Sequence, residues 1–164
     1  MKKKFLVFIT VFTLLMSNFV VYAEDGNDGL AGNGNEDGTF DDDYEEETVT
    51  LKELLLQGEE FVELDEVYSI NTIGNMLQTL KAGKSGLSGG ISLTSGGTIN
   101  IGGAASPTNK TFRIGILQPD GVIRYASGSG NIVHTFSVTQ TGTHKVYIHN
   151  ASDVTMSISV SYSY

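Results

Sequence analysis

Five side chains in the C-terminal third of the chain have the types and the spacing to bind an anion. They are Arg113, Arg124, Lys145, Tyr147 and His149. The last three alternate along one expected strand, so they share its polar face. Guanidinium groups donate paired hydrogen bonds to carboxylate or sulfate oxygens. If the strands that carry them belong to one sheet, the five form a basic patch that binds an anionic group or glycan. The alternative is a solvated surface that keeps the domain soluble.

Catalytic chemistry has little support in the sequence. Cysteine is absent, and most serines stand in expected turns or on the polar face of the last strand. His134 and His144 each share a strand face with apolar residues, which favours partly buried, hydrogen-bonded histidines over a general base. The two histidines have no evident third ligand for zinc. We therefore expect no enzyme, no metal and no cofactor. A small secreted hydrolase is the third functional hypothesis.

The strand that organises the others is expected at the C-terminus. From Val154 to Tyr164 every even-numbered residue is apolar or aromatic, and every odd-numbered residue is Ser or Thr. Alternation with a period of two predicts a β-strand with one buried face and one wet face. Ile158 stands in the middle of the buried face.

Other strands are expected at close spacing before it. Thr111–Leu117 leads through Pro119-Asp120-Gly121, which is typical of a tight turn, into Val122–Tyr125. A second strand pair is expected between residues 132 and 149. About seven short strands with Gly-rich turns predict a mainly β fold, a small antiparallel, jelly-roll-like β-sandwich over residues 84–164.

A short helical segment is expected over residues 48–83. Thr50 and Glu53 match a capping box at the start of a first helix. Asn71 or Thr72 is the expected cap of a second helix. Its apolar residues recur at helical spacing, at Ile73, Met76, Leu77 and Leu80. We expect these residues to pack against the β domain. Recognition of a partner by an amphipathic helix is the alternative.

The N-terminus has the three parts of an export signal. Lysines at positions 2–4 precede an apolar core at 5–16, and Val21-Tyr22-Ala23 fits the small-residue cleavage pattern. We expect a signal peptide over residues 1–23 that is cleaved before Glu24. Its core is too short to span a bilayer comfortably. The mature protein is therefore expected to be secreted, without stable membrane insertion.

Residues 24–47 are expected to form a disordered acidic arm. The chain has 19 acidic residues, and all but two of them precede Ser69. The arm has almost no large apolar residues, so it cannot offset the entropy lost on ordering. Asn33, Asn35 and Asp37 have the spacing of a calcium loop, but Tyr44 stands where such a loop needs a bidentate Glu. We favour a solvated arm over a calcium site.

Three segments of the body follow one another in an order that is shared with a known family. They are Ile116 to Gly121, a strand that ends near Phe136, and Thr141 to Asn150. In this respect residues 111–164 resemble bacterial pre-peptidase C-terminal (PPC-like) domains of secreted proteins, in which a strand, a Pro-Asp-Gly-like turn and a Thr-Gly-Thr entry to a Val-rich strand recur. The resemblance implies an accessory or binding role outside the cell, without catalysis. His144 replaces the aromatic residue that the family prefers.

Two functional hypotheses remain ahead of the hydrolase. The first is a secreted, non-catalytic interaction module for an anionic polysaccharide or another cell-surface partner. The second is a self-assembling structural protein of the cell surface, because a Ser- and Thr-lined last strand with few charges can accept a strand from another chain. A nucleic-acid partner is not expected for an exported chain with a net charge of −9.

Overall fold

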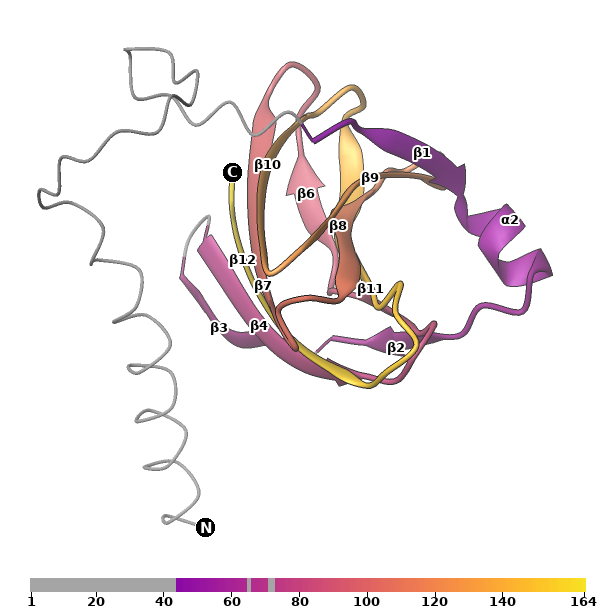
Figure 1. The fold of residues 1–164 in the computed structure, drawn as a ribbon. Coiled ribbons are helices and arrows are strands. Elements are labelled where there is room, and N and C mark those ends of the chain that lie inside the picture. The colour runs from indigo at the N-terminus through magenta and orange to yellow at the C-terminus, as the bar shows by residue number, and fades with distance from the viewer. Residues whose placement is uncertain (1–43, 65, 71–72) are drawn as a thin grey trace, which may run out of the picture. The chain divides into compact units, whose positions relative to one another are not determined.

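Two packed β-sheets make up the described part of the chain. The computed structural model describes residues 44–64, 66–70 and 73–164 (Figure 1). The predicted signal peptide, its cleavage site, the possible calcium loop and the acidic arm up to residue 43 lie outside the described residues. Tyr44 to Glu47, which were assigned to the arm, belong to the β domain: the Tyr44 hydroxyl donates a hydrogen bond to the Asn131 carbonyl, and Glu47 begins a strand.

The first sheet has seven strands in the order β1-β9-β8-β11-β5-β2, with β6 beside β11. It comprises β1 (Glu47–Thr50), β2 (Phe61–Glu63), β5 (Ser85–Leu87), β6 (Ile91–Leu93), β8 (Thr111–Leu117), β9 (Val122–Ser129) and β11 (Gly142–His149). All of its pairings are antiparallel except that of β2 with β5.

The second sheet has five strands in the order β10-β7-β12-β4-β3. It comprises β3 (Glu66–Ile70), β4 (Ile73–Leu80), β7 (Thr98–Ser106), β10 (Asn131–Ser137) and β12 (Met156–Ser163). All of its pairings are antiparallel. The prediction of a mainly β, antiparallel sandwich is confirmed, with more strands than the sequence suggested.

The core lies between the inner faces of the two sheets. Phe112, Ile114 and Ile116 of β8 face the other sheet, and Met156 and Ile158 of β12 do so from the opposite side. All five side chains are fully buried. The alternation predicted for the last strand is confirmed, because the serines between its apolar residues point outward.

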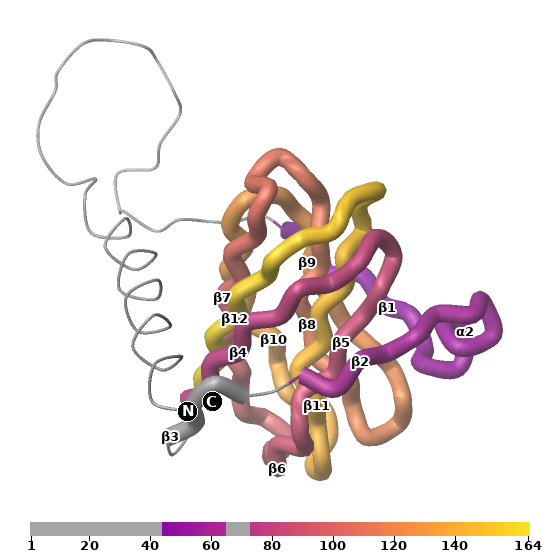
Figure 2. The backbone as a smooth tube through the Cα atoms, turned by 90° about the horizontal axis from the view of Figure 1, so that it is seen from below, coloured from indigo at the N-terminus to yellow at the C-terminus, as the bar shows by residue number. Residues whose placement is uncertain are grey.

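The last strand is not at an edge of its sheet. β12 pairs with β4 over its whole length and with β7 on the other side, as Figure 2 shows. Its backbone donors and acceptors are used within the sheet, so β12 cannot accept a strand from another chain. The observation that motivated the self-assembly hypothesis is therefore lost.

The prediction of a second helix is wrong, because the residues assigned to it form β4. Met76 and Leu80 point into the core, whereas Ile73 and Leu77 point outward. Eight consecutive pairs with β12 outweigh the helical spacing of these residues. Gly74 also disfavours a helix, and the ring of Tyr162 occupies the space of its missing side chain. The sandwich therefore begins well before residue 84.

Residues 47–63 form a segment that we call the strap, which runs from one edge of the seven-stranded sheet to the other across part of its outer face. It consists of β1, the helix α2 (Leu51–Leu56) and β2. The predicted capping box is confirmed: the Thr50 hydroxyl accepts a hydrogen bond from the Glu53 amide, and the Glu53 carboxylate accepts one from the Thr50 amide. Figure 1 shows α2 on the outer side of β8 and β9.

A second apolar cluster lies beneath the strap. Leu54 and Phe61 of the strap pack on Leu117, Tyr125 and Tyr147 of the sheet. This cluster is separate from the main core between the sheets. The part of the outer face at Leu117, Tyr125 and Tyr147 is therefore apolar and covered by the strap.

Candidate functional site

Four of the five predicted binding residues share the outer face of the seven-stranded sheet. Arg113 of β8 pairs with His149 of β11, and Lys145 pairs with Leu117, whose side chain lies in the outer cluster. Tyr147 falls between Lys145 and His149 on the same face. The strands that carry all five residues, β8, β9 and β11, do belong to one sheet, but only these four residues share a face.

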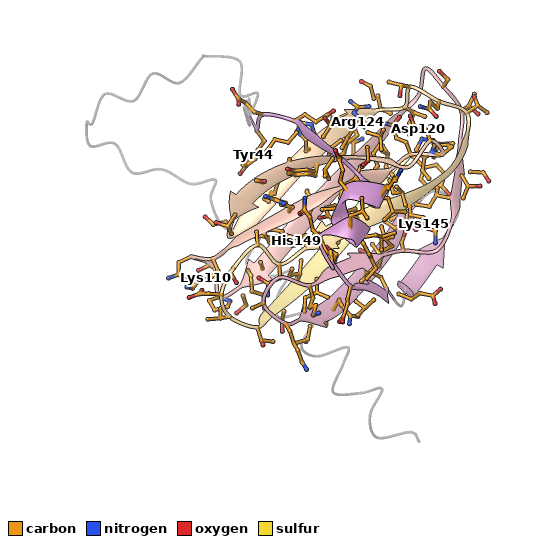
Figure 3. The ribbon with its side chains drawn as sticks, turned by 90° about the vertical axis from the view of Figure 1, so that its right-hand side faces the viewer. Tyr44, Lys110, Asp120, Arg124, Lys145 and His149 are labelled. Carbon is orange, nitrogen blue, oxygen red and sulfur yellow. The ribbon has the colours of Figure 1, made fainter. Side chains whose placement is uncertain are left out.

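Arg124 is the exception, because its side chain is on the other face of β9. It pairs with Ile116, a residue of the inner core. Its guanidinium forms an ion pair with Glu46 and donates a hydrogen bond to the Ser137 carbonyl at 2.5 Å. Glu46 also lies 3.5 Å from Nε2 of His134. Because Arg124 points to the other side of the sheet, the predicted five-residue patch is not formed. Figure 3 shows Arg124, Lys145 and His149 well separated from one another.

Tyr147 is not the exposed aromatic that the alternation suggested. It is fully buried, with the ring centroid of Phe61 of the strap at 6.5 Å and that of Tyr125 of β9 at 6.3 Å. Burial raises the pKa of Tyr147 to about 12, chiefly because the phenolate would lose its water. Its hydroxyl oxygen lies 3.4 Å from Oγ of Ser85. Tyr147 is a packing residue beneath the strap.

His149 is tied to the strap by Glu59. Nδ1 of His149 lies 2.8 Å from Oε1 of Glu59 and 2.9 Å from Oγ of Ser85, and the Ser85 hydroxyl donates to the same Glu59 oxygen. Burial lowers the pKa of His149, and the nearby Arg113 guanidinium lowers it further, whereas Glu59 acts in the opposite direction. The histidine is therefore held neutral at pH 7.

The serine, histidine and glutamate do not have the geometry of a catalytic triad. In a triad, the serine and the carboxylate contact opposite nitrogens of the imidazole ring. Here Ser85 and Glu59 both contact Nδ1 of His149, and Ser85 is fully buried. The arrangement orders the strap and leaves no accessible nucleophile in this cluster.

Among these four residues, Arg113 has a side-chain hydrogen-bond donor that is not used within the described part of the chain. Its Nε is buried and has no hydrogen-bond partner, and within the described ranges no carboxylate lies at ion-pair distance from its guanidinium. The guanidinium carbon lies 4.7 Å from the centre of the Tyr125 ring. Ser127 and His149 flank Arg113 on the neighbouring strands. A half-buried cation on an aromatic ring, with free donors, can bind a carboxylate or sulfate.

Gly115 makes room for this arrangement. It lies between Tyr125 and Tyr147 in the row of paired residues, and a side chain at this position would overlap the Arg124 carbonyl oxygen and the Tyr125 backbone. A glycine inside a strand indicates a close approach of this kind. This was the one signal in the sequence that marked the crowded part of the outer face.

Two carboxylates limit the positive charge around Arg113. Glu47 accepts hydrogen bonds from Tyr125 at 2.9 Å and from Ser127 at 3.4 Å, and Glu59 binds His149. Lys145 is half-buried and forms no ion pair with any residue that the structure describes. A site on this face is therefore a local one around Arg113, not a broad basic surface.

A metal centre finds no support in the described residues. No three His, Asp or Glu side chains among them are grouped closely enough to hold an ion. His144 is buried, and its Nδ1 lies 3.1 Å from the Gly142 carbonyl oxygen, which agrees with the expectation of a hydrogen-bonded strand histidine. Among the residues that the structure describes, no helix has the length and apolarity needed to cross a membrane.

No protein-family model and no curated protein matches the chain. Solved structures do. The pre-peptidase C-terminal domain of collagenase from Bacillus anthracis matches with 13% identity and a TM-score of 0.46, over 63% of this chain and 95% of that one. PliG of Aeromonas hydrophila, a periplasmic inhibitor of g-type lysozyme, matches with 8% identity and a TM-score of 0.45, over 64% and 97%. The C-terminal CBM6 of LamC, a marine laminarinase from Zobellia galactanivorans, matches with 13% identity and a TM-score of 0.41, over 73% and 100%.

The resemblance to pre-peptidase C-terminal domains that the sequence suggested is thus found in the structure as well. With identities of 8% to 13%, the likeness to these three proteins concerns the fold alone.

Proposed function

We propose that the protein is a secreted, non-catalytic binding module that holds a carboxylate or sulfate group of a cell-surface polymer at Arg113. The observation that carries the proposal is the half-buried guanidinium of Arg113, whose Nε has no hydrogen-bond partner and which forms no ion pair in the described part of the chain. A partly desolvated cation without a paired carboxylate gains more from a bound anion than a fully solvated one does. Secretion is taken from the N-terminal sequence.

The surroundings of Arg113 favour a single anionic group with two acceptor oxygens over a dense cluster of negative charges. The guanidinium lies over the Tyr125 ring, and Ser127 and His149 stand on either side of Arg113. Glu47 and Glu59 are close, so a polyanion meets repulsion as well as attraction. We infer that a single carboxylate or sulfate is bound at Arg113, with Lys145 as a more distant contact.

The experiment is a titration of the full chain with a uronic-acid polymer and a sulfated polymer at two salt concentrations. Arg113→Ala should abolish the binding, and Arg113→Lys should weaken it, because an ammonium group cannot donate the paired hydrogen bonds. Lys110→Ala is the matched control, since Lys110 pairs with Asp153 at 2.7 Å away from the strap. Equal losses from Arg113→Ala and Lys110→Ala would show non-specific attraction and would contradict the proposal.

A further inference from the structure

The outer face of the five-stranded sheet has an unusual composition. Four of its strands contribute outward-pointing residues, and none of these residues is ionisable. On β7 and β12 they are Thr98, Asn100, Gly102, Ala104, Ser106, Ser157, Ser159, Ser161 and Ser163. On β4 and β10 they are Ile73, Asn75, Leu77, Thr79, Asn131, Val133, Thr135 and Ser137. The ionisable side chains that are described in this protein lie elsewhere, so the face is set apart by charge.

The strand register arranges these side chains in rows across the sheet. One row at the centre of the face runs from Asn75 through Ser161 and Gly102 to Val133. The next row runs from Leu77 through Ser159 and Ala104 to Asn131. The two central strands therefore present small residues, and the larger apolar side chains stand on the flanking strands. Neighbouring strands are about 4.8 Å apart and successive outward residues about 6.7 Å apart, so the face is long enough for several linked sugar rings.

We propose that this uncharged face, formed by β4, β12, β7 and β10, binds a neutral, hydroxyl-rich polysaccharide. Its hydroxyl and amide groups both donate and accept hydrogen bonds, as the hydroxyls of a neutral sugar do. An ionised ligand would lose water on this face without meeting an opposite charge. Ser, Thr and Asn also have few rotamers to lose, so the entropic cost of ordering them on binding is small.

A protein partner fits this face less well. Tight protein interfaces are centred on buried aromatic, Arg or other large anchors. The centre of this face holds Ser161, Gly102, Ser159 and Ala104, and its three exposed apolar residues are separated on the flanks. A second copy of the chain would meet the same lack of anchors. The sheet's central strands have no free backbone edge to offer, because β7 and β12 are paired on both sides.

The test is affinity electrophoresis of the full chain through gels that contain neutral polymers: hydroxyethyl cellulose, β-1,3-glucan, galactomannan and dextran. We expect retardation by at least one polymer, and no change between about 0.05 and 0.5 M salt because no ion pairs are involved. Ser161→Glu should weaken the retardation by at least about tenfold, because the bound polymer would cover the carboxylate without offering it a positive charge. Ser159→Lys should have the same effect with the opposite charge.

Controls separate this face from the rest of the molecule. Ser92 is exposed on β6 of the other sheet, so Ser92→Glu is a matched change that should leave retardation intact. Arg113→Ala should also leave it intact, which distinguishes this proposal from the anion site. Thermal unfolding of each variant checks that it is folded. The proposal is overturned if none of the four polymers retards the protein, or if Ser92→Glu acts like Ser161→Glu. It is also overturned if sizing shows a dimer that Ser161→Glu abolishes.

Discussion

Oε1 of Glu59 lies 2.8 Å from Nδ1 of His149, and this pair joins the strap to the end of β11. Both side chains are mostly buried. Ser85 contacts both of them, and Lys84 pairs with Glu60 at 2.6 Å beside them. Glu46, Glu59 and Glu60 are thus part of the fold, where they contact Arg124, His149 and Lys84 respectively.

The first prediction concerns pH. Burial lowers the pKa of His149 in the folded chain, so its imidazole takes up a proton only at a pH below 6.5. In the unfolded chain the same imidazole takes up a proton near pH 6.5. The unfolded state then holds more protons below that pH, so the contribution of His149 to stability is complete above 6.5 and is lost as the pH falls through the lowered pKa. Urea unfolding between about pH 8 and pH 5 should show this loss. His149→Gln should have a flatter profile, and identical slopes for both proteins would contradict the assignment.

The second prediction concerns the strap. Leu54 of α2 is 5% exposed and packs against the sheet, whereas Leu56 of the same helix is 78% exposed. Leu54→Ala should lower the free energy of unfolding by about 2–5 kcal/mol, because it leaves a cavity over the sheet. Leu56→Ala should change it by about 0.5 kcal/mol or less. Denaturant unfolding of both variants measures the difference. A strap that does not pack on the sheet in solution would give equal, small effects.

The third prediction concerns the last strand. Ile158 is fully buried in the main core, and the neighbouring Ser159 points outward. Ile158→Ala should cost about 2–5 kcal/mol, and Ser159→Ala about 0.5 kcal/mol or less. The two changes are one residue apart on the same strand, so each serves as the control for the other. Comparable losses would mean that β12 is not half-buried.

The fourth prediction compares two glycines inside strands. A Cβ at Gly115 would overlap the Arg124 carbonyl oxygen, whereas a Cβ at Gly102 would lie 3.4 Å from its nearest neighbour, Oγ of Ser161. Gly115→Ala should therefore destabilise the protein by about 1–3 kcal/mol or more, since the backbone of β9 must move. Gly102→Ala should be nearly neutral or slightly stabilising, because alanine reduces the entropy of the unfolded chain. Thermal unfolding of both variants decides it, and a larger loss at Gly102 would contradict the packing described.

The sequence by itself determined the features that depend on neighbouring residues. The alternation in Val154–Tyr164 follows from the two-residue repeat of a strand, and the capping box at Thr50 needs only the next turn of the chain. Both appear in the structure as predicted. Arg113, Lys145, Tyr147 and His149 share one face because alternation and antiparallel pairing together fix it.

Tertiary structure decided what lies on top of each face. The helical spacing of Ile73, Met76 and Leu80 was overridden by pairing with β12, more than 75 residues away in the sequence. Tyr147 is buried because the strap folds over it, and Arg124 lies on the inner side because of the register of β9. A local pattern fixes which side chains point the same way. Only long-range contacts determine whether those side chains face water or are covered by another part of the chain. The reason is that covering a face is stabilised by apolar contacts between segments that are distant in the sequence.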